Sequence, residues 1–329
     1  MGGEYMTLTM LSRIAENLFW MGRLIERAEG IARALTVQYF STLEENINPT
    51  WEPILNSVGQ LEPFFEIQDL ASPANVIEYL IFSETNPSSV FQCISKAREN
   101  ARGVREMISK ETWEILNVTF HEIENYSREK KEQIKNKPDG LFLFLKERSF
   151  LFQGVTDNTM FRGTGFHFLE AGKFIERADQ TARILDVKYH IPLKRIEDVG
   201  NPVDIFQWKA LLDSIGAYEA YLKCYGTKIL PIQVAELLIF NKEMPRSLIF
   251  CMDKALISVR EISQEISREK GSMYMNRAEQ KLGKLYYQLA YSNIEEIFFF
   301  GLHEYLTNYI NDLIGLGSQM NYTFFGYSY

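Results

Sequence analysis

Apolar residues recur at intervals of three and four along two long stretches of the chain, residues 16–40 and 166–190. On an α-helix, this spacing places the apolar side chains on a single face. The first stripe comprises Leu18, Met21, Ile25, Ala28, Ala32, Leu35 and Tyr39, and the second comprises Phe168, Ala171, Ile175, Ala178, Ala182, Leu185 and Tyr189. The pattern predicts two long helices, and the alanines in each stripe would let another helix approach closely.

The rest of the pattern predicts more helices and no sheet. Helical spacing and start signals cover residues 10–44, 51–65, 75–82, 86–109, 112–136 and 141–158. Turn-forming residues separate several of these segments, at 46–49, 138–140 and 162–165. The alternation typical of strands is absent, so we expect an all-α protein.

The order of motifs in the first half of the chain returns in the second half. Glu26-Arg27-Ala28 recurs 150 positions later as Glu176-Arg177-Ala178. Further matches pair Trp51 with Trp208, Gly59 with Gly216, Pro73 with Pro231, Pro87 with Pro245, Cys93 with Cys251 and Val104 with Val259. A period this long predicts an internally duplicated helical bundle and not a solenoid of short repeats.

This duplication suggests a domain organisation. We expect a disordered lead-in at residues 1–9, a first helical repeat at 10–160 and a second at 161–329. The long first helices, with their alanine stripes, are the candidates for a central pair about a pseudo-two-fold axis. We favour one domain with a shared core over two independent halves.

Composition narrows the classes of function. A net charge of −8 argues against a nucleic-acid binder, since phosphate contacts need a basic surface. Three cysteines provide no disulfide framework and fit a reducing compartment. No apolar run reaches the length of a membrane span, and the first residues do not resemble a secretory signal. We therefore expect a cytoplasmic protein that does not enter a membrane.

Motifs that would indicate a cofactor or a catalytic centre are missing. The sequence contains no P-loop, no glycine-rich dinucleotide turn and no histidine pair at metal-binding spacing. Cys93 and Cys251 fall on apolar helix faces, where a core thiol is a better interpretation than a nucleophile. We expect no cofactor and no metal, and we assign no catalytic residue.

The chemically informative residues lie beside the apolar stripes, on a second face of each long helix. They are Arg23, Glu26 and Arg27 in the first helix and Lys173, Glu176 and Arg177 in the second. Neither Arg27 nor Arg177 has an acidic residue three or four positions away. Adjacent residues point about a hundred degrees apart on a helix. Neither glutamate can therefore be the main partner of the arginine that follows it.

Three interpretations of this motif stay open. A salt-bridge network between the helices would pair Glu26 with Arg177 and Glu176 with Arg27 across the pseudo-two-fold axis. Alternatively, the guanidinium groups could hold a carboxylate or phosphate ligand. The third interpretation is a solvated face. Glu29–Arg33 and Asp179–Arg183 have the spacing of ordinary pairs that support a helix surface.

These motifs resemble those of the bacterial alpha-E domain family. The resemblance covers about residues 10–322 and depends on residues 10–13, 15–18, 20–23, 26–29, 86–89, 97–102 and 176–179. The family is named after a helical fold with a Glu-Arg motif, which matches Glu26-Arg27 and Glu176-Arg177. The second copy departs from the first at Lys173 and Glu170, where the first has Arg23 and Trp20. If the two copies once had equal sites, only the first would keep a complete one.

The resemblance also implies a setting for the protein. Members of the family occur beside, or fused to, circularly permuted ATP-grasp proteins, often with a transglutaminase-like protein nearby. ATP-grasp ligases make amide bonds through acyl phosphates. We therefore expect a helical accessory or binding component that holds a separate ATP-grasp ligase, or its peptide or carboxylate substrate. The alternatives are an enzyme acting on an amide or carboxylate at the Glu26/Arg27 cluster, and a purely structural protein that forms homo-oligomers.

Overall fold

The computed structural model describes residues 8–42, 50–129, 137–190, 202–270 and 276–326. Within these ranges every regular element is helical, so the expected all-α class is confirmed. Residues 1–7, most of the expected lead-in, lie outside the described residues. Among the helices that are described, none is both long and apolar enough to cross a lipid bilayer.

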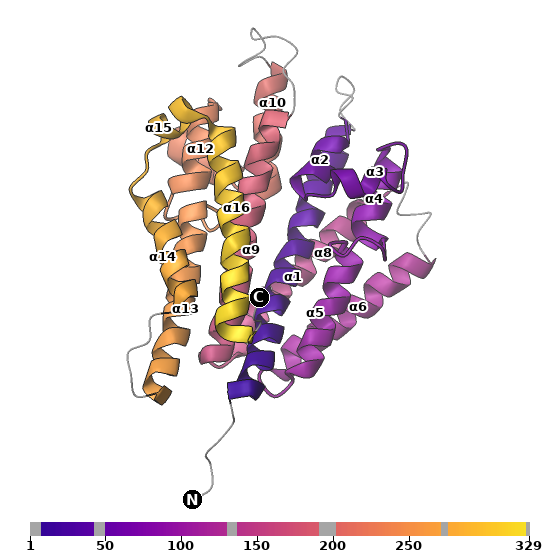
Figure 1. Cartoon of the computed structure of the whole chain (residues 1–329). Helices are drawn as coiled ribbons and strands as arrows, with labels where there is room; N and C mark the ends of the chain where they lie inside the picture. The colour runs from indigo at the N-terminus through magenta and orange to yellow at the C-terminus, as the bar shows by residue number, and fades with distance from the viewer. Residues whose placement is uncertain (1–7, 43–49, 130–136, 191–201, 271–275, 327–329) are drawn as a thin grey trace, which may run out of the picture.

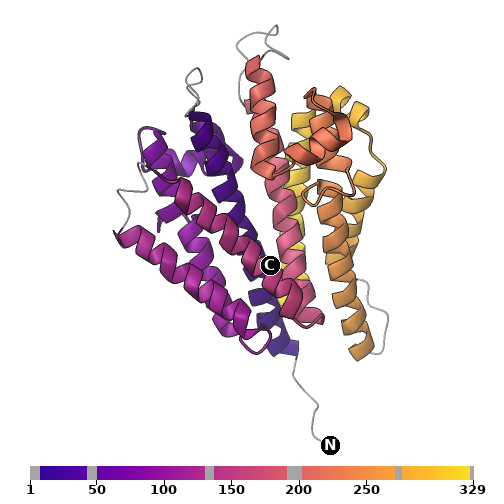
Figure 2. The same ribbon diagram turned by 180° about the vertical axis from the view of Figure 1, so that it is seen from behind.

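Two long helices, α1 (Leu8–Thr42) and α9 (Thr164–His190), pack against each other at the centre of the molecule (Figure 1). They are the two helices that the apolar stripes predict. The other helices of the first half lie on one side of this pair and most of those of the second half lie on the other. Figure 2 shows the same division from behind.

Shorter helices complete the two sides. After α1 come α2 (Glu52–Ser57), α3 (Leu61–Phe65), α4 (Pro73–Phe82), α5 (Val90–Gly103), α6 (Lys110–Glu129) and α8 (Asp139–Thr159). After α9 come α10 (Pro202–Ile215), α11 (Tyr218–Tyr225), α12 (Pro231–Phe240), α13 (Leu248–Lys270), α14 (Arg277–Ala290), α15 (Ile294–Phe300), α16 (Leu302–Met320) and a π-helical turn, η2 (Asn321–Phe325). Helix α5 packs against α1, and α13 packs against α9.

Glycine, and not alanine, sets the closest approach of the central pair. A Cβ atom added to Gly22 of α1 would overlap the main-chain carbonyl oxygen of Leu169 on α9. A Cβ added to Gly172 of α9 would overlap the carbonyl oxygen of Phe19 on α1 in the same way. The backbones therefore meet at two points, and both points require a residue without a side chain.

The expected role of the alanine stripe needs a correction. Ala28, Ala32, Ala178 and Ala182 are buried, as the pattern predicts. However, Ile25 and Ala28 line a small cavity together with Ile94 of α5, Leu116 of α6 and Leu145 of α8. Helix α1 is covered on two sides. Gly22 lies on the side that meets α9, and this part of the stripe lies on the side that meets the helices of its own half.

Three predicted segments differ in their boundaries. The stretch expected at residues 51–65 is divided into α2 and α3, because Gly59 adopts a left-handed conformation with φ of 67°. The helix expected at residues 86–109 is shorter, since Ser89 caps the first turn of α5 and Asn86 closes the preceding turn through its side chain. The predicted segment at 112–136 begins earlier, in α6, and its end lies outside the described residues.

Candidate functional site

The Glu-Arg motifs of α1 and α9 pair with each other across the central contact. Arg177 donates from Nε and Nη2 to the two carboxylate oxygens of Glu26, with both distances 2.7 Å. Arg27 donates from Nε and Nη2 to Glu176 at 2.5 and 2.9 Å. The cross-pairing that the sequence suggests as one of three interpretations is therefore present, and both ion pairs are bidentate.

The direction of the two helices explains this reciprocity. Gly22 meets Leu169, and four residues further along α1, Glu26 meets Arg177. Both contacts advance along the two helices together, so α1 and α9 run parallel. One turn beyond the glycine contact, each glutamate therefore points at the arginine of the opposite helix.

The carboxylate of Glu29 joins Glu26 in a larger network. Arg246, which precedes α13, donates to Glu26 at 2.9 Å and to Glu29 at 2.6 Å, and so bridges the two acids. Gln153 of α8 donates to Glu26 at 3.3 Å and to Glu29 at 3.1 Å. Ser149, one turn earlier on α8, donates to Glu29 at 3.1 Å, and Arg33 donates to it at 2.6 Å. Each of the four carboxylate oxygens thus accepts two hydrogen bonds.

The expectation that Glu29 and Arg33 form an ordinary surface pair is wrong. The two residues do form an ion pair, at 2.6 Å, but the side chain of Glu29 is fully buried. Helix α8 covers it with Ser149 and Gln153, so the acid belongs to the interior network. Spacing along one helix reveals the partner on that helix but not which face another helix covers.

The two long helices hold their glutamates with different third donors. Arg23, three residues before Glu26, donates to Glu176 at 2.8 Å. Lys173 has the same position relative to Glu176, yet its Nζ pairs with Glu170 on its own helix. Arg246 supplies the corresponding donor to Glu26. The sequence difference between the two long helices is thus accompanied by an arginine from a different part of the chain.

Burial and charge oppose each other at the two glutamates. Both side chains are almost completely buried. Burial raises the pKa of the Glu26 carboxyl, but Arg177 and Arg246 outweigh it and lower the pKa to about 2. Burial likewise raises the pKa of Glu176, and Arg27 and Arg23 lower it to about 2. Both acids are therefore ionised at neutral pH and are unsuited to act as general bases.

The buried cysteines and the described histidine and acidic residues offer no alternative chemistry. Cys93 and Cys251 are fully buried, as expected for core thiols, and burial raises the pKa of each to about 12. Such a thiol carries almost no thiolate at neutral pH. Within the described ranges, no cluster of histidine, cysteine and carboxylate side chains is arranged to hold a metal ion.

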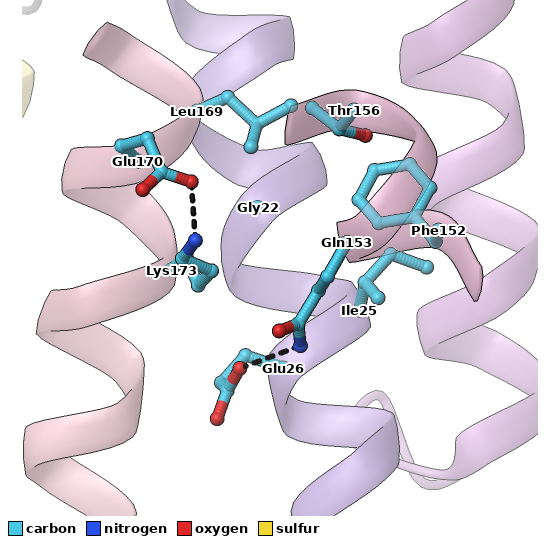
Figure 3. A pocket seen from close by; sticks show the side chains of 9 residues that line it. All are labelled: Gly22, Ile25, Glu26, Phe152, Gln153, Thr156, Leu169, Glu170 and Lys173. Atoms are coloured by element: carbon cyan, nitrogen blue, oxygen red, sulfur yellow. Dashed lines mark hydrogen bonds and ion pairs between the residues drawn. The ribbon is translucent and has the colours of Figure 1, made fainter. Parts of the chain in front are cut away.

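A small cavity lies beside the Glu26 end of the network (Figure 3). Its lining includes Gly22, Glu26, Gln153, Lys173 and Glu170, and the dashed lines in Figure 3 mark the bonds among them. Its volume of about 10 Å³ is roughly the room that one water molecule needs. Because the surrounding charges are already paired, the cavity has neither the size nor the free groups of a substrate pocket.

All six residues that the sequence singles out lie along this contact between α1 and α9. Arg23, Arg27 and Glu176 form one group. Glu26 and Arg177 form a second, while Lys173 stands beside it in its pair with Glu170. The sequence reasoning missed Gln153 and Arg246, which come from distant elements. A signal for Arg246 does exist, since it lies between Pro245 and Ser247 where the first half has an uncharged serine, Ser88.

The fold and the site define an all-helical protein whose two central helices exchange buried Glu-Arg ion pairs. Residues 10–325 match the model of the Alpha-E family, described as a predicted alpha-helical domain with a conserved ER motif. The chain belongs to this family, which confirms the resemblance found in the sequence. Both Glu-Arg pairs lie within the matched residues.

Curated relatives come from mycobacteria. An uncharacterised protein of Mycobacterium bovis is 22% identical over 305 residues, which make up 87% of this chain and 33% of the relative. Uncharacterised proteins from two strains of Mycobacterium tuberculosis match with the same identity and coverage. The chain therefore spans about a third of the length of the curated relatives it matches. No solved structure matches the chain significantly.

Proposed function

We propose that the protein is a helical accessory component of a peptide- or amide-forming pathway that depends on an ATP-grasp ligase. Its role is to hold the ligase, or the peptide or carboxylate that the ligase uses. The link to the ligase comes from the family resemblance. The relatives leave room for further domains, because about two thirds of each lies outside the match. An ATP-dependent partner and three free cysteines fit a cytoplasmic location.

The observation that carries the accessory role is the complete pairing of the Glu26 side of the motif. An active site needs groups that are free to bind and react with a substrate. Here the carboxylate oxygens of Glu26 and Glu29 already accept two hydrogen bonds each. Breaking a buried ion pair is costly, so these residues are better suited to fixing how two helices pack than to chemistry. This argues against the alternative of an enzyme at the Glu26/Arg27 cluster.

We also infer that the two halves arose by internal duplication. The reciprocal contacts support it: Gly22 and Gly172 play matching roles, and so do Glu26 and Glu176. Under this proposal the ion pairs hold two copies of one unit in register. Each glutamate would then be satisfied by the opposite copy, and the motif would matter for assembly of the domain.

The test is affinity capture from native cells, with the tagged chain expressed at its natural level. The proposal expects an ATP-grasp protein to co-purify and to remain bound through size exclusion. A tagged chain carrying Gly154→Ala, an exchange at a site with open space, is the matched control and should capture the same partner. Recovery of the chain alone, as a monomer or homo-oligomer, would contradict the proposal. A homo-oligomer would favour the purely structural alternative.

A further inference from the structure

The group around Glu176 is less complete than the group around Glu26. Arg23 and Arg27 share the single carboxylate of Glu176, which accepts three hydrogen bonds from them. On the other side, Arg246 places both of its Nη atoms on carboxylates. Within the described ranges, Nη1 and Nη2 of Arg23 and Nη1 of Arg27 donate no hydrogen bond to a protein acceptor. Three guanidinium nitrogens on one helix face are therefore available.

The local charge is positive. Arg23 and Arg27 carry two positive charges against the one negative charge of Glu176. Asp179 is the next acid that acts on Arg27, but it is already paired with Arg183 at 2.8 Å. One positive charge is left in a protein whose net charge is −8. Semi-buried cations without a full set of acceptors favour an anionic partner.

The free nitrogens can be reached and are held in place. The exposed fractions of the Arg23 and Arg27 side chains are 14% and 25%. The guanidinium of Arg23 lies 5.1 Å from the centre of the Trp20 ring, which restricts its orientation. Opposite, α16 comes close, since a Cβ on Gly317 would lie 3.5 Å from Arg23 Nη1. Glu176 then fixes both arginines through their Nε atoms.

We propose that Arg23 and Arg27 form an oxyanion-binding site beside α16, which takes the carboxylate or phosphate group of a ligand. Glu176 positions the two arginines, and their three free N–H-bearing nitrogens bind the anion. Among the described residues, the equivalent region around Glu26 offers no such site, because Lys173 pairs with Glu170 and Arg246 already donates to Glu26 and Glu29. The proposal does not depend on the ligase partnership, so either can fail without the other.

The test is calorimetric titration of the whole chain with inorganic phosphate and, separately, with acetate, replacing chloride at constant ionic strength. The proposal expects saturable binding of at least one of the two. Binding of phosphate alone or of acetate alone would identify the oxyanion class. Because charge-assisted hydrogen bonds are lost, Arg23→Gln should weaken binding about tenfold or more. The matched control is Arg98→Gln, which removes the same charge from a similarly exposed arginine of α5 that bonds Glu99 and Asn117, and it should leave the affinity unchanged.

A second measurement does not require any variant to fold. In the wild-type chain, phosphate or acetate should shift the NMR signals of the Arg23 and Arg27 Nε–H groups and leave those of Arg33 and Arg183 in place. The proposal is overturned if the wild type shows no saturable response to either anion. Equal weakening by Arg23→Gln and Arg98→Gln, or equal shifts at all four arginines, would also overturn it, because binding would then reflect general charge.

Discussion

Gly22 of α1 lies directly against the main-chain carbonyl of Leu169 on α9, with no room for even a methyl group. Gly172 lies in the same way against Phe19. This backbone contact brings the two helices close enough for Glu26 to reach Arg177 and for Glu176 to reach Arg27. The glycines and the ion pairs are therefore parts of one arrangement.

Gly22→Ala should destabilise the protein by about 3 kcal/mol or more, because the helices must separate to admit the methyl group. Gly154→Ala is the matched control, since Gly154 lies within α8 and a Cβ there meets nothing within 4 Å. The control should stabilise by about 0.5–1 kcal/mol through its helix propensity. Chemical denaturation measures both. Equal effects of the two exchanges would show that the central contact is loose.

Ala32→Leu should cost on the order of 1–3 kcal/mol, because Ala32 is fully buried and the larger side chain overpacks its surroundings. A thermal melt compares this variant with the wild type. An unchanged melting temperature would mean that the packing around Ala32 is loose enough to accept the larger side chain.

Much of the fold could be predicted from periodicity alone. The stripes of α1 and α9 predict two long helices, and the segment predicted at 75–82 covers all but the first two residues of α4. The turn at Gly59 could not be located, because helical spacing continues across it. Periodicity also favoured the alanine face as the central contact, while the decisive residues are Gly22 and Gly172, each of which directly follows a residue of the apolar stripe.

The candidate site was also predicted only in part. Unpaired arginines on a helix face predict a partner on another helix, and the equal spacing of the two motifs suggests the cross-pairing. The burial of Glu29 and its contact with Arg246 could not be predicted, because they depend on how α8 and the segment before α13 pack over α1. A contact with a side chain from a distant element produces no periodic pattern in the sequence of the helix that it touches.

Acid should destabilise the protein through Glu26 and Glu176. The pKa of each falls from an ordinary value of 4.5 to about 2 on folding, so the unfolded chain binds protons first. The stabilisation is fully present above about pH 4.5 and is lost as the pH falls toward 2. It amounts to on the order of 3 kcal/mol for each carboxylate. Denaturant unfolding across this range checks it; a flat profile between pH 5 and pH 2 would contradict the pairing.

Arg246→Ala should cost about 3 kcal/mol, since it removes a donor from two buried carboxylates. Combining it with Lys173→Arg and Glu170→Gln should recover part of this loss, because an arginine at position 173, freed from Glu170, can donate to Glu26 as Arg23 donates to Glu176. Denaturation of the four chains measures the recovery. The pair of exchanges without Arg246→Ala is the control and should give no comparable gain. If the lost stability is not recovered, Arg246 does not take the place of an arginine at position 173.

The central claim is that the Glu-Arg motif holds α1 and α9 together, and a double-mutant cycle on Glu26 and Arg177 tests it most directly. Glu26→Gln alone should cost about 3–5 kcal/mol, because it leaves a buried cation without its partner. Arg177→Met alone should cost a similar amount. The double variant should lose clearly less than the sum, since neither charge is then stranded. Small, additive losses with the fold intact, together with loss of ligase capture, would contradict the account and favour a ligand-binding motif.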